Sequence, residues 1–159
     1  FFPAGATVGG HALFAGGTPK DGSLVVDAYD ASLTLTAAAD LSSAQNSYAA
    51  AAVGGYALFA GNTADADVYD ASLTKTTVGL LSAARQPDAV TAGGYAFFAG
   101  GDASGTVDVC DASLTRTTLT ALSEARDSMA AAAVGDYVLF AGGRNAASLY
   151  HDTVDVYTI

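Results

Sequence analysis

One stretch of this chain gathers side chains that could bind a ligand. Residues 143–152 hold a guanidinium, an amide, a phenol, an imidazole and a carboxylate within ten positions. Loops positioned by a rigid scaffold are the usual place for binding residues. The candidate ligand-binding residues are therefore Arg144, Asn145, Tyr150, His151 and Asp152. The alternative is a long solvated loop without a ligand.

The sequence offers little for catalysis or metal binding. A copper site needs a cluster of His and Tyr ligands, and the two histidines, His11 and His151, occupy unlike repeat positions. One cysteine, Cys110, excludes an internal disulfide and a cysteine-based zinc site. Calcium would need several oxygen ligands in one loop, and only Asp65 and Asp67 come near this pattern. We expect no catalytic residue, no metal and no cofactor, and we expect that the protein is not an enzyme.

The charge balance and the lack of long apolar runs argue against two classes of partner. Sixteen acidic and six basic residues give a net charge of −10. A nucleic-acid-binding surface needs a basic stripe that neutralises phosphates, and the sequence contains none. No run approaches the roughly 18 apolar residues of a membrane helix. We expect neither nucleic-acid binding nor membrane insertion.

A repeat organises the whole chain. Phe14, Phe59, Phe98 and Phe140 each stand in a Phe-Ala-Gly phrase, at intervals of 39 to 45 residues. A second phrase rich in Val and Asp follows each one, at residues 26–30, 67–70, 107–111 and 154–157. Repeats of this length with short strands and glycine turns indicate a solenoid or a propeller.

Each complete unit is predicted to form four antiparallel strands. In the third unit the predicted strands are 89–92, 95–99, 106–110 and 115–120, and Gly93-Gly94 suits a tight hairpin between the first two. The alanine runs 48–53 and 129–134 would favour a helix by propensity alone. Because both are short and end at Val-Gly, we predict inner strands that face a crowded axis. Four antiparallel strands make a propeller blade.

Recurring residues at fixed repeat positions have structural interpretations. The aspartates fall into two sets, and for both we predict that the side chain caps a turn at a strand end. Cys110 replaces a tyrosine of the sister repeats and is expected to be buried and inert. Arg85 and Arg126 are expected to form hydrogen bonds between blades. The two sets are Asp27, Asp67, Asp108 and Asp155, and Asp30, Asp70 and Asp111.

The chain resembles the kelch-repeat family. The resemblance spans nearly the whole chain and rests on the Gly pair after the second strand, the Tyr-Asp after the third, and the Arg that opens the next unit, where Gln45 departs. The chain has no Trp, and its repeats are shorter than the roughly 50 residues of kelch. It is similar to divergent, short bacterial-type kelch repeats. The resemblance implies a β-propeller with an interaction or carbohydrate-binding role.

The fourth unit is incomplete. It has candidates for three strands and then reaches Ile159, without the outer fourth strand. An unpaired strand edge invites pairing with another chain. We expect a partner chain, an irregular use of residues 1–4, or sequence outside this chain to cover it. The start at Phe1-Phe2-Pro3 suggests a processed chain or part of a longer one.

The sequence therefore predicts an all-β fold: a kelch-like β-propeller, or a propeller segment, with one repeat domain over residues 1–159. Its units are approximately 1–43, 44–83, 84–124 and 125–159. The expected function is a non-enzymatic binding module that contacts a protein or carbohydrate through inter-strand loops. The first alternative is a structural protein that self-assembles by pairing blade edges, and a lesser one is a sugar-processing enzyme. The compartment stays open, with a secreted or cell-surface location favoured.

Overall fold

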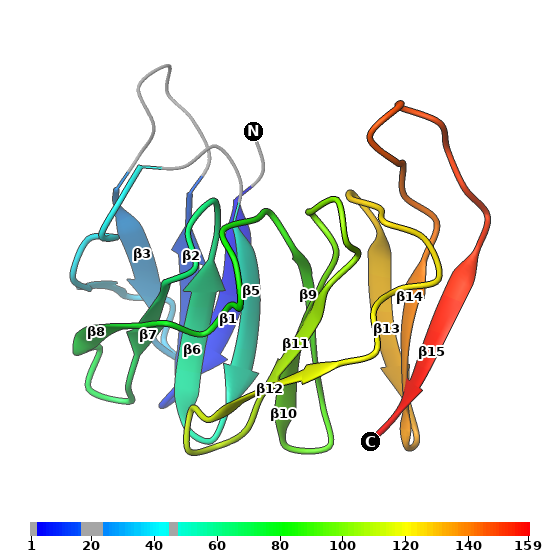
Figure 1. Cartoon of the computed structure of the whole chain (residues 1–159). Coiled ribbons are helices and arrows are strands. Elements are labelled where there is room, and N and C mark those ends of the chain that lie inside the picture. Colours follow the sequence, from blue (N-terminus) through cyan, green and yellow to red (C-terminus); the bar gives the residue numbers. More distant parts are fainter. Residues whose placement is uncertain (1–2, 17–23, 45–47) are drawn as a thin grey trace.

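The structure, a computed structural model, describes residues 3–16, 24–44 and 48–159. These residues form four antiparallel sheets side by side, and none of them is helical (Figure 1). The described residues therefore contain no helix that is long and apolar enough to cross a membrane.

The strands follow one another in chain order within each sheet. The first sheet contains β1 (Ala4–Val8), β2 (His11–Ala15), β3 (Val26–Tyr29) and β4 (Leu35–Ala37). The second contains β5 (Ala49–Val53), β6 (Tyr56–Ala60), β7 (Ala66–Tyr69) and β8 (Lys75–Val78). The third contains β9 (Asp88–Ala92), β10 (Tyr95–Ala99), β11 (Val107–Cys110) and β12 (Arg116–Leu119). The fourth contains β13 (Ala130–Val134), β14 (Tyr137–Ala141) and β15 (Val154–Thr158).

The sheets are arranged as propeller blades, which we number 1 to 4. Their first strands are neighbours in succession, β1 beside β5, β5 beside β9, and β9 beside β13. The prediction of an all-β propeller segment with four blade units, the last without its outer strand, is confirmed. The described residues form an arc of blades and not a closed ring (Figure 1).

The alanine-rich segments are strands, as predicted. β5 pairs in register with β6 through a hairpin at Gly54-Gly55, where φ is +56° and +84°. Side chains of this size let the inner strands of adjacent blades approach closely, so that Thr91 Oγ1 of β9 both accepts from Ala52 N at 2.9 Å and donates to Ala52 O at 2.8 Å. Packing at the inner edge of the arc thus overrides helix propensity.

The hydrophobic core lies between blades. One cluster of buried residues lies between each pair of neighbouring sheets. Phe59, Phe98 and Phe140 each extend from their own blade into the cluster shared with the preceding blade. Cys110 belongs to the cluster between blades 2 and 3, and burial raises the pKa of its thiol to about 11. Cys110 is therefore buried, as expected, and is a neutral thiol at physiological pH.

One aspartate set caps turns, as predicted. Asp111 Oδ1 accepts from the backbone N–H groups of Ser113 and Thr115, both at 2.9 Å. The turn also places Leu114 at φ +62°. Asp30 and Asp70 make the same pair of contacts in blades 1 and 2.

For three of the four aspartates in the other set, the prediction of a turn cap was wrong. Asp67, Asp108 and Asp155 sit in the middle of third strands, and their carboxylates bind the linker that arrives from the preceding blade. We call this arrangement the linker contact. The linker donors are Ser42 for Asp67, Ser82 and Arg85 for Asp108, and Ser123 and Arg126 for Asp155. The expected hydrogen bonds of Arg85 and Arg126 thus join a linker to the blade that it enters; Gln45 lies outside the described residues.

Candidate functional site

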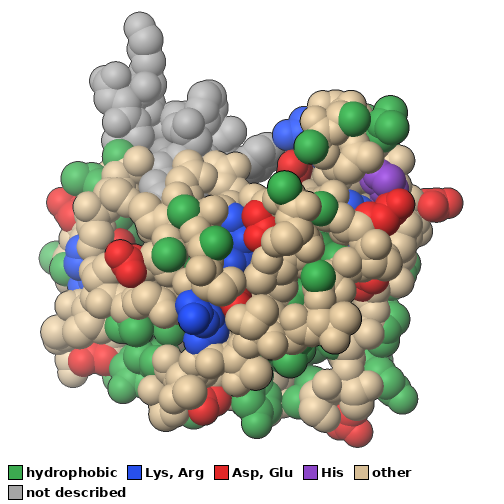
Figure 2. All heavy atoms as spheres, viewed as in Figure 1, with side chains coloured by type: hydrophobic (Ala, Val, Ile, Leu, Met, Phe, Trp, Pro, Cys, Tyr) green, Lys and Arg blue, Asp and Glu red, His purple; other side chains and the backbone are tan. Residues whose placement is uncertain are grey.

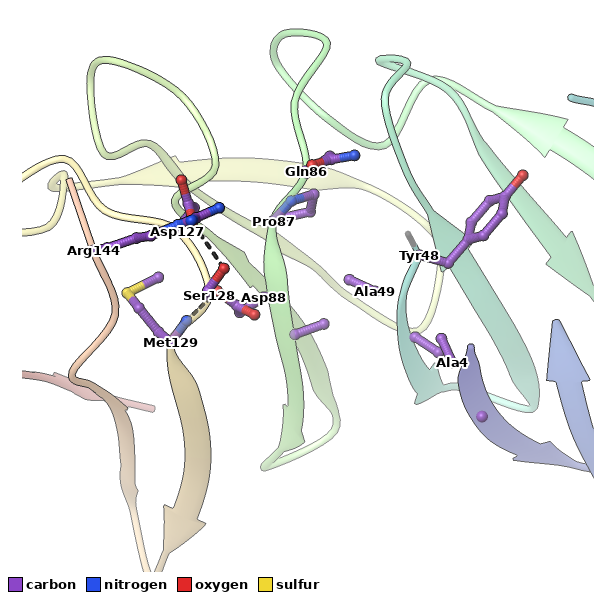
Figure 3. Close-up of a pocket in the computed structure, with 13 residues that line it drawn as sticks. Ala4, Tyr48, Ala49, Gln86, Pro87, Asp88, Asp127, Ser128, Met129 and Arg144 are labelled. Atoms are coloured by element: carbon purple, nitrogen blue, oxygen red, sulfur yellow. Dashed lines mark hydrogen bonds and ion pairs between the residues drawn. The ribbon is translucent and has the colours of Figure 1, made fainter. Parts of the chain in front are cut away.

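A cavity of about 710 Å³ opens at the inner edge of the arc, where the first strands begin. We call it the axial cavity. Figure 3 shows residues from blades 1, 2 and 3 and from the linker into blade 4 around it. Its polar lining comes from Tyr48, Gln86, Asp88, Asp127, Ser128 and Arg144, and its apolar lining from alanines, Pro87 and Met129.

Arg144 closes one side of this cavity. The backbones of Asp127 and Arg144 exchange two hydrogen bonds, of 2.9 and 3.0 Å, and the Arg144 Nε donates to Asp127 Oδ1 at 3.0 Å. Ser128 Oγ donates to the same carboxylate oxygen at 2.8 Å. The hydrogen bond and the charge of Asp127 raise the pKa of Arg144. The ion pair ties the long loop of blade 4 to the rim of the axial cavity (Figure 3).

Asp88 is one of two cavity carboxylates, with Asp127, that the sequence did not suggest. It begins β9, at a position where the other three first strands begin with Ala. Its Oδ2 accepts from Met129 N at 2.8 Å, which joins blade 3 to blade 4 beside the cavity. Burial and the nearby charge of Asp127 raise the pKa of Asp88 to about 6, although the Met129 N–H opposes this. The signal was present in the sequence as a charged residue in an alanine position.

Replacing Asp88 by Asn should remove a pH dependence of stability. The pKa of Asp88 is about 6 in the folded chain against 3.8 for an ordinary carboxyl, so folding favours the protonated form. The free energy of unfolding therefore falls as pH rises from about 4 to 6, by about 1–2 kcal/mol for this half-buried group. Asn keeps an oxygen for Met129 N and carries no charge, so Asp88→Asn should be the more stable protein at pH 7.

Urea unfolding between pH 4 and pH 7 measures this difference. Asp136→Asn is the matched control, because Asp136 is an exposed aspartate in the hairpin at the opposite end of blade 4. Parallel pH profiles for the wild type and Asp88→Asn would contradict the assignment.

The structure places the five predicted ligand-binding residues in different surroundings. Arg144 alone lines the axial cavity, and both Arg144 and Asn145 line a second cavity of about 540 Å³ behind the Asp127–Arg144 pair. Asn145 holds its own loop in shape, because its Oδ1 accepts from Ala147 N and Leu149 N. Tyr150 is 85% exposed, and Asp152 is also exposed.

His151 faces a different neighbour. Its Nδ1 lies 2.6 Å from Glu124 Oε2 in the linker into blade 4, and its Nε2 is buried without a hydrogen-bond partner in the structure. The five residues therefore do not converge on one point. Arg144 reaches the axial cavity, whereas His151 fixes the far side of the same loop to the linker.

The axial cavity offers several groups that can form hydrogen bonds with a polar ligand. It presents carboxylate acceptors, a guanidinium, an amide and hydroxyl groups in a recess of ordinary ligand size. The described residues contain no group of three or more His, Cys, Asp or Glu that could hold a metal ion. Figure 2 shows basic side chains in isolated spots beside acidic ones on the face in view.

Comparison with known proteins adds no assignment. No protein-family model matches the chain. No curated protein matches it significantly in sequence.

Proposed function

We propose that the protein is a non-enzymatic, kelch-type β-propeller binding module whose axial cavity takes a neutral oligosaccharide. The observation that carries the proposal is the convergence of Asp88, Asp127 and Arg144 on one recess of about 710 Å³. Three separate segments of the repeat scaffold hold these groups, so the recess is already formed without a ligand.

The charges of the recess favour a neutral polar ligand. Carboxylates and a guanidinium held in place can accept from and donate to pairs of sugar hydroxyl groups. The net charge of −10 opposes anionic sugars and nucleic acid. Hydrogen bonds to charged groups contribute more than neutral ones, about 1.5–3 kcal/mol each.

Two observations support the kelch-type character of the scaffold. The Gly pair of blade 3 lies against the linker backbone, since Gly101 N donates to Arg126 O at 2.9 Å. The arginine that opens the next unit is buried, in Arg85 as in Arg126. These are the repeat residues on which the family resemblance rests.

A screen of immobilised neutral and acidic oligosaccharides tests the proposal. We expect binding to at least one neutral oligosaccharide and none to the acidic ones. Asp88→Ala, which restores the alanine of the sister repeats, and Arg144→Ala should each weaken binding about tenfold or more in calorimetric titrations with that sugar. Asp136→Ala is the control and should bind like the wild type. Absence of binding across the screen, or unchanged affinity in both cavity variants, would refute the proposal.

Self-assembly is the second candidate function. Hydrophobic side chains are exposed along the outer edge of the molecule formed by β14 and β15 (Figure 2).

A further inference from the structure

A small cavity lies at the linker contact of blade 2. Its volume is about 190 Å³, and among the described lining residues it shares Tyr48 alone with the axial cavity. We call it the blade 2 pocket. Its lining residues are Ser42, Ser43, Tyr48, Phe59, Thr63, Asp65, Asp67 and Thr77.

In blades 3 and 4 an arginine of the linker fills the linker contact. The Arg85 guanidinium donates to Asp108 Oδ2 at 2.8 Å and to Phe98 O at 3.1 Å. Arg126 makes the same kind of ion pair with Asp155. Both arginine side chains are fully buried, so each guanidinium is enclosed by the fold. This position of the repeat therefore binds a guanidinium group.

Blade 2 keeps the oxygen acceptors of this contact. Phe59 pairs with Asp67 across β6 and β7. The register is that of Phe98 and Asp108 across β10 and β11, so each carbonyl has the same position relative to the carboxylate of its blade. Asp67 is only 5% exposed, so its charge lies inside the fold.

The linker into blade 2 does not carry the arginine. Arg85 and Arg126 each come three residues after the serine of the linker contact, and the residue at that position before blade 2 is Gln45. Glutamine has no positive charge and two N–H donors, whereas arginine has a positive charge and five. The sequence therefore removes the guanidinium from blade 2 and leaves the carboxylate.

Lys75 of β8 replaces the missing charge only in part. Its Nζ lies 3.9 Å from Asp67 Oδ1 and donates to Asp40 O at 2.6 Å and to Ser42 Oγ at 3.0 Å. The described lining of the blade 2 pocket does not include Lys75. Asp67 Oδ2 accepts from Ser42 N at 2.7 Å, which uses one of its two lone pairs. This oxygen can accept a second donor from the pocket.

The blade 2 pocket has a buried floor and an exposed mouth. Tyr48, Phe59 and Asp67 are buried, whereas Thr63 and Asp65 are exposed. A guanidinium group pairs with carboxylates and packs against aromatic rings. The floor offers one carboxylate and two aromatic side chains, and Asp65 adds a second negative charge at the mouth. A cation can therefore enter from solvent and meet complementary groups.

We infer that the blade 2 pocket binds the guanidinium group of a ligand, either an arginine side chain of a peptide or a small free guanidinium compound. The ligand completes in blade 2 the contact that Arg85 and Arg126 make within the chain. An ammonium group fits less well, because it lacks the planar fork that reaches a carboxylate and a carbonyl together. The inference does not depend on the oligosaccharide proposed for the axial cavity.

A titration followed by NMR tests the inference. Methylguanidine should bind with a dissociation constant on the order of 1 mM, as expected for one small group. It should shift the backbone amide signals of Ser42, Thr63 and Thr77, which line the pocket. Methylammonium should bind at least about tenfold more weakly.

N-acetylarginine amide distinguishes the two sources of the group. Binding of this compound would identify an arginine side chain as a ligand that the pocket admits. Binding of methylguanidine alone would identify a small free guanidinium compound. Either result supports the guanidinium assignment.

Variants of the two pocket carboxylates test the contacts. Asp67→Asn should weaken methylguanidine binding about tenfold or more, because it removes the charge of the hydrogen-bond acceptor. Asp65→Asn leaves the buried contacts intact and should weaken binding about two- to threefold, as for an exposed charge pair. Asp136→Asn, in the hairpin of blade 4, is the control and should bind like the wild type. The dispersion of each NMR spectrum reports whether the variant is folded.

Gln45→Arg gives the decisive measurement. It places in the linker the arginine that the sister linkers carry, so it should abolish methylguanidine binding and raise the melting temperature. Ala44→Arg adds the same side chain at a neighbouring exposed position and should still bind methylguanidine. Unshifted amide signals in the wild type, equal binding of methylammonium, or unchanged affinity in both Asp67→Asn and Gln45→Arg would each overturn the inference. None of these variants changes a residue of the axial cavity, so the oligosaccharide proposal is tested separately.

Discussion

Replacing Arg85 by Ala should lower the free energy of unfolding by about 3 kcal/mol. Arg85 Nη1 donates to Asp108 Oδ2 at 2.8 Å, and both side chains are fully buried. Its Nη2 also donates to Phe98 O at 3.1 Å. Removing one partner of a buried ion pair leaves an uncompensated charge, at a cost of roughly 3–5 kcal/mol. The lower end applies because Ser82 and Thr118 continue to donate to Asp108.

The pH dependence of the free energy of unfolding should also change in Arg85→Ala. Burial raises the pKa of Asp108, but hydrogen bonds from Ser82, Thr118 and Arg85 outweigh it and lower the pKa overall. Asp108 therefore stabilises the fold above the pKa of an unfolded carboxyl and loses that contribution as pH falls through its folded pKa. Without Arg85 this acid-dependent loss should shrink.

Urea unfolding of Arg85→Ala beside Arg116→Ala measures the effect. Arg116 is an exposed arginine on β12, and its removal should change stability by no more than about 0.5 kcal/mol. Equal stabilities of the two variants would show that the linker contact of blade 3 does not hold the fold together.

Gly101→Ala should destabilise the fold by a similar amount, for a different reason. Gly101 has φ +77°, and a methyl group there would lie 1.9 Å from Gln86 O, a backbone atom of the linker into blade 3. The left-handed conformation costs a non-glycine residue roughly 1–2 kcal/mol, and forcing extra atoms into a packed site costs about 1–3 kcal/mol more. We expect a loss of about 3 kcal/mol in total, since the backbone cannot yield as a flexible side chain would.

Gly94→Ala separates the two contributions. Gly94 has φ +80° but nothing within 4 Å of the added methyl group, so this variant should lose only the roughly 1–2 kcal/mol of the backbone term. Thermal unfolding of both variants compares them directly. A loss in Gly101→Ala no greater than in Gly94→Ala would mean that the linker moves aside freely.

Local patterns in the sequence were sufficient for the strands and the blade count. The Val-Gly endings identified the alanine runs as strands, because a hairpin glycine is a short-range signal that acts on its nearest neighbours. The turn role of Asp111 was equally local, since its partners Ser113 and Thr115 lie two and four residues away. Such contacts depend on the backbone of a single turn.

Contacts between distant residues were not predictable in the same way. Asp108 resembles Asp111 in sequence, yet it binds Ser82, 26 residues earlier. Only the path of the linker over the blade brings these groups together. Asp88 carries no loop signal because it lies at the start of a strand, and the axial cavity forms only where separate first strands converge. For the same reason, of the predicted residues only Arg144 reaches that cavity.

The linker contact has a consequence for how such an array changes length during evolution. In each case the donors precede the blade that carries the acceptor, and blades 3 and 4 share the same pair of an arginine and an aspartate. Consider a segment that starts in one linker and stops at the same point of the next linker. If this segment is duplicated or deleted, each remaining junction still has a donor and an acceptor of the same types. Arrays with different numbers of blades can therefore arise by unequal recombination, without new complementary surfaces having to evolve.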